Sequence, residues 1–469
     1  MATRTAKPHT SRTPSRAAPR PTRAERQAAG KALREKFPRT VHGEWAPSTR
    51  RTDPVTQIIT SSKGRIPELV PIRYGRMMVS PFTLYRGTAS IMAADLARTP
   101  DTGITVQACG DCHLMNFGGF ATPERQIIFD INDFDETMPG PWEWDVKRLA
   151  ASMVLAARSN GFPRADQREA ALACVRSYRE RMAEFAAMTP MEVWYSRIDL
   201  DRIFASFTDK ESVARFRRRL AKATAKSMDQ GDVPMMIEGQ GSQPAIKDNP
   251  PLIYHHQVFN LGKTRTAIER AFGGYLESLA DDRRALLDHF QLADFALKVV
   301  GVGSVGTVCA VFLMVSADDV PLFLQVKEAG PSVLAPFVGK GRYANDGQRI
   351  VEGQRLTQAA SDIFLGWTVG KRGRHFYVRQ LRDVKLKPMV DIFNRTTMVE
   401  FGELCGWTLA RAHARSGDAS MIAGYLGTRD VFDQAAAKFA AAYADQAERD
   451  HAAFTAAIRK GRIEVYVEH

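Results

Sequence analysis

The chain has 469 residues, of which 44% are hydrophobic and 25% are charged. These proportions are those of a globular protein with a sizeable core, and they exclude a chain too polar to fold. The formal net charge of +13 is concentrated at the start, because residues 1–52 hold thirteen Lys and Arg against three Glu. A chain of this length has room for two or three domains, or for one bilobal enzyme with a tail.

The first segment, residues 1–52, is predicted to be a disordered basic arm. Its start, TRTAKPHTSRTPSRAAPRPTRAER, is rich in Pro, Ser and Thr and has almost no large apolar side chains. The segment also lacks the apolar run of a secretory signal peptide. Such an arm is suited either to weak contact with an anionic partner, such as nucleic acid or a charged surface, or to a solubilising role without a partner.

Two further features bear on the compartment. The longest uncharged run, VVGVGSVGTVCAVFLMVSA at residues 299–317, contains three glycines together with Ser and Thr, so it is a poor membrane span. The five cysteines are not spaced as a disulfide framework, which favours a reducing compartment. We therefore expect a cytoplasmic protein without a membrane span.

The first strongly marked motif is ACGDCHLMNFGG, residues 108–119, which follows a predicted strand at 104–109. Cys109-x-x-Cys112-His113 matches the attachment signature of a c-type haem, but that attachment takes place on exported chains. A thioredoxin-like pair would need a helix to open at Cys109, whereas the chain continues into a loop marked by Gly and Pro. We expect no haem, and we interpret Cys112 as a small residue in a tight loop.

The segment after this loop, RQIIFDINDFDET at 125–137, is predicted to be a strand that ends in an acidic cluster. Asp130, Asp133, Asp135 and Glu136 lie within seven residues. Because like charges repel, such a cluster is favourable mainly around a cation. The alternative is an ordinary polar loop followed by an acidic surface turn.

The order Gly-Asp-x-His-x-x-Asn, then a strand, then INDFD resembles the catalytic loop and metal-binding segment of aminoglycoside and choline kinase-like enzymes. The resemblance implies that Asp111 is the catalytic base for an acceptor hydroxyl. It also implies that Asn116 and Asp133 hold Mg²⁺ against the nucleotide phosphates, with Asp135 supporting a second metal position.

Three residues near this loop need separate interpretations. Cys109 stands where the resembled enzymes often have His, so the role of that position is open. His113 is predicted to brace the loop through hydrogen bonds. Arg86, on a predicted helix in SPFTLYRG, is a cation suited to a phosphate or a substrate carboxylate, and a structural salt bridge explains it equally well.

The chain then becomes helical, with predicted helices at 141–158, 165–188 and 264–290. We assign residues 53–290 to a mostly helical lobe that carries the catalytic loop and the metal segment.

A glycine-rich segment follows, with Gly301, Gly303, Ser304, Gly306 and Thr307. A GxGxxG pattern that binds a dinucleotide must open a helix, but here a β-branched run follows. The order strand, glycine loop, strand, turn and strand resembles the nucleotide-binding hairpin of kinases, which makes these five residues candidates for phosphate binding. We assign residues 291–385 to a β-rich nucleotide-binding lobe.

Two charged residues complete this predicted lobe. Lys327 lies near the end of an apolar strand and needs an acidic partner. Glu352, on an amphipathic helix at 347–360, corresponds to the helix glutamate that pairs with the strand lysine in kinases. After a strand at 375–383, a helix at 398–418 resembles the one that normally precedes the catalytic loop, and we assign residues 386–469 to C-terminal helices that complete the helical lobe.

The predicted fold is therefore α+β, a protein-kinase-like bilobal fold in which the catalytic loop precedes the nucleotide-binding lobe, as in a circular permutation. The whole pattern resembles the bacterial domain-of-unknown-function family 2252 (DUF2252). The motifs that carry this resemblance are RYGRMMVSPFTLYRG, CGDCHLMNFG, INDFDET, IVEGQRL, FYVRQL and LARAHARSGD.

The family resemblance says little about activity, whereas the resemblance to kinase-like enzymes predicts an ATP- and Mg²⁺-dependent phosphotransferase that acts on an unidentified hydroxyl acceptor, or a nucleotidyl transferase that uses the same parts. The alternative from a different class is a non-catalytic nucleotide-binding or scaffold protein. The acceptor itself is not identified by any motif.

Overall fold

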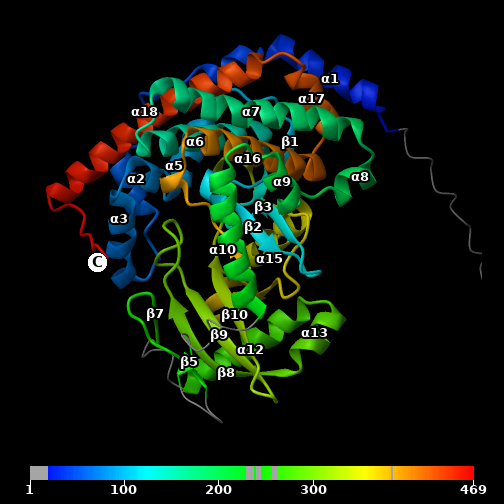
Figure 1. The fold of residues 1–469 in the computed structure, drawn as a ribbon. Coiled ribbons are helices and arrows are strands. Elements are labelled where there is room, and N and C mark those ends of the chain that lie inside the picture. The colour runs from blue at the N-terminus through cyan, green and yellow to red at the C-terminus, as the bar shows by residue number, and fades with distance from the viewer. Residues whose placement is uncertain (1–19, 229–236, 239–243, 256–261, 382–383, 469) are drawn as a thin grey trace, which may run out of the picture.

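A computed structural model describes residues 20–228, 237–238, 244–255, 262–381 and 384–468. The helices gather in one part of the molecule and the largest sheet lies in another, which is the arrangement of an α+β protein (Figure 1). We call these the helical part and the sheet part. No described helix combines the length and the hydropathy needed to cross a membrane.

The helical part is built from both ends of the chain. Its longer helices α6, α7, α16 and α18 pack around one core, and shorter helices cover the outside. The close crossing of α16 over α7 depends on Gly406, because a Cβ at that position would overlap the carbonyl oxygen of Cys174. The helices are α1 Arg23–Lys36, α2 Pro54–Thr60, α3 Val70–Met78, α4 Pro81–Arg86, α5 Ala89–Leu96, α6 Trp142–Ser159, α7 Arg164–Ala187, α8 Pro190–Tyr195, α9 Leu200–Ser206, α10 Lys210–Met228, α16 Arg395–Ser416, α17 Ala419–Leu426 and α18 Val431–Arg459.

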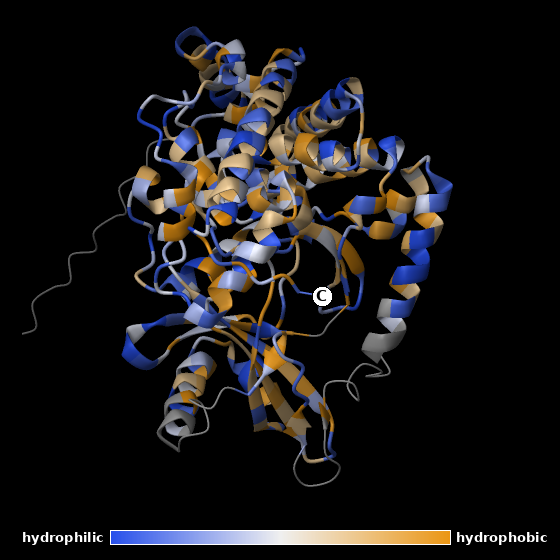
Figure 2. Cartoon of the chain, turned by 90° about the vertical axis from the view of Figure 1, so that its left-hand side faces the viewer, coloured by the Kyte–Doolittle hydropathy of each residue, from blue (hydrophilic) through white to orange (hydrophobic). Residues whose placement is uncertain are grey.

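The sheet part contains a six-stranded antiparallel sheet in the order β11-β12-β10-β9-β8-β7. Figure 2 shows that these strands are largely hydrophobic. Helix α10 of the helical part is largely hydrophilic by comparison; it lies at the right of Figure 2 and ends in a grey trace. The strands are β7 Ile253–Tyr254, β8 Phe290–Lys298, β9 Cys309–Ser316, β10 Pro321–Ala329, β11 Gly366–Val369 and β12 His375–Gln380, and the helices of this part are α12 Gly262–Glu277, α13 Asp281–Leu287, α14 Ala335–Val338 and α15 Asp346–Thr357.

Small antiparallel ladders connect the two parts. The strands β1 Thr105–Ala108 and β4 Met138–Pro141 pair with each other, and β2 Phe117–Ala121 pairs with both β3 Ile127–Ile131 and β13 Lys385–Leu386. These ladders hold the segment 109–137 between the helical part and the sheet. A short pair, β5 Ile237–Glu238 with β6 Ala245–Ile246, lies beside β8.

The predicted order of strand, glycine loop, strand, turn and strand is confirmed by β8, β9 and β10, which pair as consecutive antiparallel neighbours. Lys327 directly faces Tyr377 on the adjacent strand β12. Because side chains alternate along a strand, Lys327 and Gln325 share one face of the sheet while Val326 belongs to the other.

The prediction of disorder through residue 52 is wrong for the described residues 20–52. Thr22 and Glu25 form a capping box at the start of α1, and Gly30 lies against the backbone of Met421 in α17. The Arg34 guanidinium donates to the carbonyl oxygen of Tyr425 at 2.8 Å. The polar composition concealed this helix because α17 supplies its packing partner. Residues 1–19 of the predicted arm lie outside the described residues.

The predicted lobe boundary at residue 290 also differs from the structure. Helix α12 was assigned to the helical lobe, but Ile268, Phe272 and Tyr275 pack on the sheet beside β11. The sheet part therefore begins no later than β7, because β7 pairs with β8 and the apolar face of α12, which follows β7, covers one face of the strands.

Candidate active site

The loop 109–116 leaves β1 through a turn that requires glycine. Gly110 has φ of +80°, and a Cβ at this position would overlap the carbonyl oxygen of Glu136. The loop therefore packs backbone to backbone against the acidic segment that follows β3.

One carboxylate fixes the start of this loop. Asp145, in the first turn of α6, accepts hydrogen bonds from the backbone N–H groups of Cys109 at 2.6 Å and Gly110 at 3.0 Å. The same carboxylate lies 3.2 Å from Nε2 of His413 in α16. The helix expected at 398–418 is thus α16, and it contacts the loop through this buried chain of hydrogen bonds.

Asp111 points into a cavity and is held by an arginine of α6. Both Nε and Nη2 of Arg148 donate to Oδ1 of Asp111, the Nε bond measuring 2.8 Å. The Asp111 side chain is 23% exposed. Burial raises the pKa of this carboxyl above its usual value, and the neighbouring Arg148 opposes that rise.

His113 and Asn116 shape the loop around Asp111. The Asn116 amide nitrogen donates to the backbone oxygen of Asp111 at 2.7 Å, which leaves its amide oxygen available as an acceptor. The His113 Nε2 lies 3.9 Å from Asp111 Oδ2, beyond hydrogen-bond distance, and its Nδ1 has no partner among the described residues, so the predicted bracing of the loop by hydrogen bonds of this side chain is not observed. Burial, together with the nearby Arg86 and Arg148, lowers the pKa of His113 well below its usual value, so the ring is neutral at pH 7.

The acidic cluster after β3 is divided between two environments. Asp130 is fully buried and accepts from Arg411 of α16 at 2.6 Å and from the backbone N–H of Ala359 at 2.8 Å. It therefore joins β3 to α15 and α16 and does not face a cation with its neighbours. Asp133, Asp135 and Glu136 instead line the cavity of Asp111.

Asp135 is the acidic partner of Lys327. Its Oδ2 accepts from the Lys327 Nζ at 2.6 Å, and its Oδ1 accepts from the Tyr377 hydroxyl at 2.6 Å. Although burial opposes ionisation, the lysine and its hydrogen bond lower the pKa of Asp135. Burial and the adjacent Asp135 charge raise the pKa of Asp133. The two carboxyls of one short segment are thus shifted in opposite directions.

The predicted pair between Lys327 and Glu352 is wrong. Glu352 forms its ion pair with Arg355 one turn along α15, at 3.1 Å. The residue of α15 that reaches the acidic segment is Arg349, which donates to the backbone oxygens of Asp135 at 3.0 Å and Thr137 at 2.6 Å. A residue of α15 therefore does connect the sheet part to the acidic segment, as predicted for Glu352. That residue is the cation Arg349, and it binds backbone oxygens instead of Lys327.

The glycine loop between β8 and β9 lies against the helical part. The Arg65 Nη1 donates to the carbonyl oxygen of Val305 at 2.6 Å, and the Arg76 Nη1 donates to that of Gly301 at 2.6 Å. Within the described residues, no backbone N–H from Val302 to Gly306 donates a hydrogen bond. Two carbonyls of this loop are therefore engaged by arginines, while its N–H groups are left for another acceptor.

One cavity of about 530 Å³ brings most of the predicted residues together. The glycine loop forms one side, and the loop 109–116 with the acidic segment forms another. The predicted residues that line it are Arg86, Asp111, His113, Asn116, Asp133, Asp135, Gly301, Gly303, Ser304 and Thr307. Lys327 touches this wall through Asp135, Gly306 packs against Arg65 outside the lining, and Glu352 is not part of it.

The acidic wall carries oxygen groups of the type that hard divalent cations prefer. Among the described residues, no three His, Cys, Asp or Glu side chains converge on a point that would hold a metal. The available set is therefore smaller and consists of the Asn116 amide oxygen with the carboxylates of Asp133 and Asp135. Mg²⁺ commonly binds through one or two carboxylates together with substrate phosphates, so this set suits it better than a closed protein site would.

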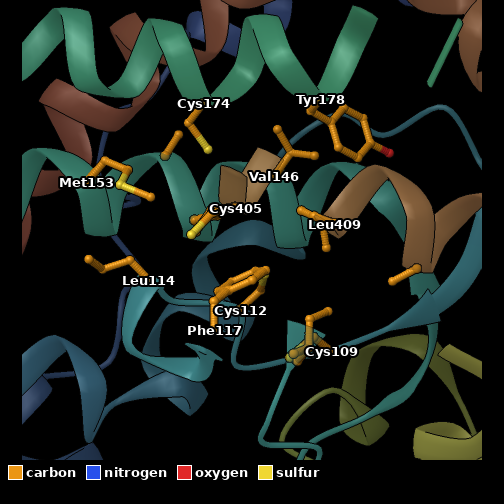
Figure 3. Close-up of a cluster of buried hydrophobic side chains, with 14 of the residues drawn as sticks. Cys109, Cys112, Leu114, Phe117, Val146, Met153, Cys174, Tyr178, Cys405 and Leu409 are labelled. Atoms are coloured by element: carbon orange, nitrogen blue, oxygen red, sulfur yellow. The ribbon is translucent and has the colours of Figure 1, made fainter. Parts of the chain in front are cut away.

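The cysteines of the opening motif belong to the core. Figure 3 shows Cys109 and Cys112 beside Phe117, with Cys405 and Cys174 above them. All four thiols are buried, and burial raises the pKa of Cys112 well above its usual value. The unionised thiol of Cys112 packs as a small apolar group, in agreement with its interpretation as a loop residue.

Sequence reasoning missed the residues that hold the site in shape. Arg148, Asp145, Arg349 and Tyr377 each bind a backbone or side-chain group of the loop or the acidic segment. One signal for Arg148 was present, because it follows Asp145 by three residues on a helix that is otherwise strongly apolar. Charged groups on the buried face of such a helix need partners.

Comparison with known proteins gives a family. The family described as "Uncharacterized protein conserved in bacteria (DUF2252)" matches residues 65–457, and the chain belongs to this family. No curated protein and no solved structure gives a significant match.

Proposed function

We propose that this chain is an ATP- and Mg²⁺-dependent phosphotransferase of the kinase-like class, with a catalytic loop that precedes the nucleotide-binding sheet in the sequence. The observation that carries the proposal is the shared cavity, which is lined by the glycine loop and by Asp111, Asn116 and Asp133 although these segments are far apart in the chain. A glycine loop with free N–H groups opposite a carboxylate and an amide is an arrangement suited to a metal-bound polyphosphate.

Each group then has a separate role. The N–H groups of the loop 302–306 bind phosphate oxygens, and Asn116 with Asp133 holds the metal ion. Bound Mg²⁺ would neutralise phosphate charge and align the terminal phosphoryl group. Lys327 and Tyr377 keep Asp135 ionised and oriented beside that position.

Asp111 is the proposed base for the acceptor hydroxyl. Its oxygen Oδ1 is held by Arg148, so Oδ2 is the atom left to take the proton. Burial raises the pKa of the carboxyl, which makes it a better proton acceptor than an exposed aspartate. Nucleotidyl transfer remains a variant of this proposal, because it uses the same metal and base with the nucleotide turned.

A second candidate is a non-catalytic nucleotide-binding protein. It is favoured by the missing ion pair between Lys327 and Glu352, since active kinases of the resembled class use that pair to align the lysine. The first candidate requires that Asp135 and Tyr377 do this instead.

The test is Mg²⁺-dependent binding and turnover of ATP by the full chain. We expect wild-type protein to bind ATP only with Mg²⁺ and to release or transfer its terminal phosphate. The substitution Asp133→Asn should weaken Mg²⁺-dependent binding and abolish turnover together, because it removes a metal ligand. Asp318→Asn, in the exposed turn after β9, is the matched control and should change neither.

The outcomes separate the candidates. Binding without turnover under any acceptor would favour the non-catalytic protein. If Asp133→Asn changed only thermal stability, or if ATP did not bind at all, the proposed function would be wrong.

A further inference from the structure

The wall of the active-site cavity opposite the acidic segment is basic. It is formed by the loop after α2, by α3 and by the end of α4, which contribute Arg65, Arg73 and Arg86. Lys63 lies in the same lining and is exposed. The proposed function gives Arg65 and Arg73 no role as substrate ligands, so these two arginines need a separate explanation.

None of these cations forms a direct ion pair with a carboxylate in the described part of the chain. Arg73 is 1% exposed and donates to the hydroxyls of Ser62 at 2.7 Å and Ser61 at 3.1 Å and to the carbonyl oxygen of Gly87 at 3.0 Å. Its partners are all neutral, and its buried Nε has no partner. Arg65 donates to the backbone oxygens of Ser61 and Val305, and the carboxylates of Glu136 and Glu328 act on it electrostatically without a direct ion pair.

Arg86 is the least satisfied of the three. Its guanidinium lies 5.8 Å from the ring centre of Phe82, and its Nε is buried without a partner. No described residue accepts a hydrogen bond from this side chain. The Asp111 carboxylate is close enough to act on Arg86 electrostatically, but Asp111 is already bound by Arg148.

Burying a cation without a direct ion pair costs free energy, and this cost lowers the pKa of the cation. Burial lowers the pKa of Arg73 to about 9 and lowers those of Arg65 and Arg86 as well. Buried charges that are left unpaired by the protein are commonly paired by a ligand, and guanidinium groups match phosphate oxygens in geometry. The cavity therefore contains a preformed position for an anion.

We propose that Arg65, Arg73 and Arg86 form a phosphate-binding subsite for the acceptor, so that the substrate is a hydroxyl compound that already carries a phosphate group. This inference rests on the proposed function, because it assigns the nucleotide to the glycine loop and the metal side. The acceptor phosphate lies on the arginines and its hydroxyl extends to Asp111. The cations that line this wall suit a dianionic phosphate monoester better than a singly charged carboxylate.

The same chemistry has a second source, namely the terminal phosphates of ATP itself. The two sources differ in stoichiometry. An acceptor subsite binds phosphate together with the nucleotide, whereas a nucleotide site binds one or the other.

The experiment measures binding of inorganic phosphate to the full chain by titration calorimetry, with and without saturating Mg²⁺ and a non-hydrolysable ATP analogue. We expect one phosphate to bind, and to bind with unchanged or improved affinity when the analogue is present. Arg86→Gln should weaken phosphate binding by about 10-fold or more, because a charge-assisted contact is lost, whereas no hydrogen bond within the described part of the protein is lost with it. Arg98→Gln, an exposed residue outside the cavity, is the control.

A second variant keeps the arginines. Ser90 lines the same cavity, so Ser90→Asp should repel phosphate and weaken its binding to a similar degree while all three cations stay in place. Arg86→Lys should restore part of the affinity.

The results that overturn the proposal are distinct from those that overturn the proposed function. Competitive displacement of phosphate by the ATP analogue, absence of phosphate binding, or wild-type affinity in both Arg86→Gln and Ser90→Asp would each refute an acceptor subsite. If phosphate bound to the arginines but no nucleotide bound, the anion site would stand and the phosphotransferase proposal would fall.

Discussion

At the scale of single residues, the loop 109–116 and the acidic segment after it contain aspartates in three different states. Asp130 is paired with Arg411, Asp135 is held ionised by Lys327, and Asp111 has a raised pKa while it shares one oxygen with Arg148. Environment rather than residue type therefore distinguishes the structural aspartate from the proposed metal ligand and the proposed base. The same substitution, Asp to Asn, is therefore predicted to have different effects on ATP binding and on phosphoryl transfer at different positions of the site.

The substitution Asp111→Asn tests the base. We expect ATP binding to stay nearly intact, because the proposed metal ligands and the glycine loop are unchanged. Phosphoryl transfer should fall by about 10²–10⁴-fold, the usual contribution of a general base. Single-turnover transfer and equilibrium binding of ATP, measured on the same preparations, separate these effects.

Comparing ATP binding in Asp111→Asn and Asp133→Asn shows whether the two residues have separate roles. If Asp111→Asn weakened ATP binding as strongly as Asp133→Asn, the two residues would belong to one metal site. If neither transfer nor binding changed, Asp111 would be a structural partner of Arg148.

At the scale of elements, two helices from opposite ends of the chain hold the loop 109–116. Asp145 of α6 receives the N–H groups of Cys109 and Gly110, and His413 of α16 lies behind that carboxylate. The first two residues of the loop thus acquire hydrogen bonds that neither β1 nor β2 supplies. The loop geometry is consequently a property of the packing of α6 on α16.

Removing this support should destabilise the protein. In Asp145→Asn, the carboxylate is replaced by a neutral amide that has only one acceptor oxygen for the two backbone N–H groups. We therefore expect the free energy of unfolding to fall by about 3 kcal/mol. Denaturant unfolding measures this loss. The control is Asp445→Asn, because Asp445 forms an ion pair with Arg158 on an exposed surface and should cost at most about 0.5 kcal/mol.

Transfer activity gives a second measurement on the same variant. Asp145→Asn should lower transfer even at temperatures where the protein remains folded, since Gly110 positions Asp111. Wild-type stability in Asp145→Asn would show that the hydrogen bonds to Cys109 and Gly110 are replaceable by water.

The elements that the sequence predicted well are those whose signals are local. Alternation and β-branched residues predicted β8, β9 and β10, and the acidic segment after β3 was recognisable from residue spacing alone. Within the candidate site, the glycine loop and the segment 111–135 were identified as parts of one cavity through a resemblance of motif order.

What the sequence did not predict depends on distant partners. Lys327 needed an acid, but whether Asp135 or Glu352 supplied it depended on the orientation of α15 against the sheet. Helix α1 is polar enough to suggest disorder, and it is ordered by α17 from the far end of the chain. Such choices are made by tertiary packing, which composition and periodicity do not encode.

At the scale of the whole molecule, segments remote in the sequence meet at one cavity. The helical part contributes the basic wall, the loop 109–116 contributes Asp111, and the sheet part contributes the glycine loop and the residues after β10. Arg65 and Arg76 attach the glycine loop to the helical part through its carbonyl oxygens. A ligand in this cavity must therefore contact both parts at once.

This arrangement predicts linked protection in hydrogen exchange. Binding of Mg²⁺ and a non-hydrolysable ATP analogue should slow backbone exchange in residues 299–308 and in residues 109–117 together. The slowing should reach about 100-fold when the ligand concentration is 100 times Kd, because ligand stabilisation of the bound form limits local opening. Helix α13, at the far side of the sheet part, should exchange as in the free protein.

The decisive comparison in that experiment is between the protection of residues 299–308 and that of residues 109–117. Protection of 299–308 alone would mean that the nucleotide binds to the sheet part without engaging the loop of Asp111, and the single-site architecture would then be wrong. Equal slowing throughout the chain would indicate general stabilisation in place of a cavity-specific contact. Joint protection that Asp133→Asn reduces in both segments would tie the two walls to one metal-bound ligand, because the substituted residue belongs to only one of them.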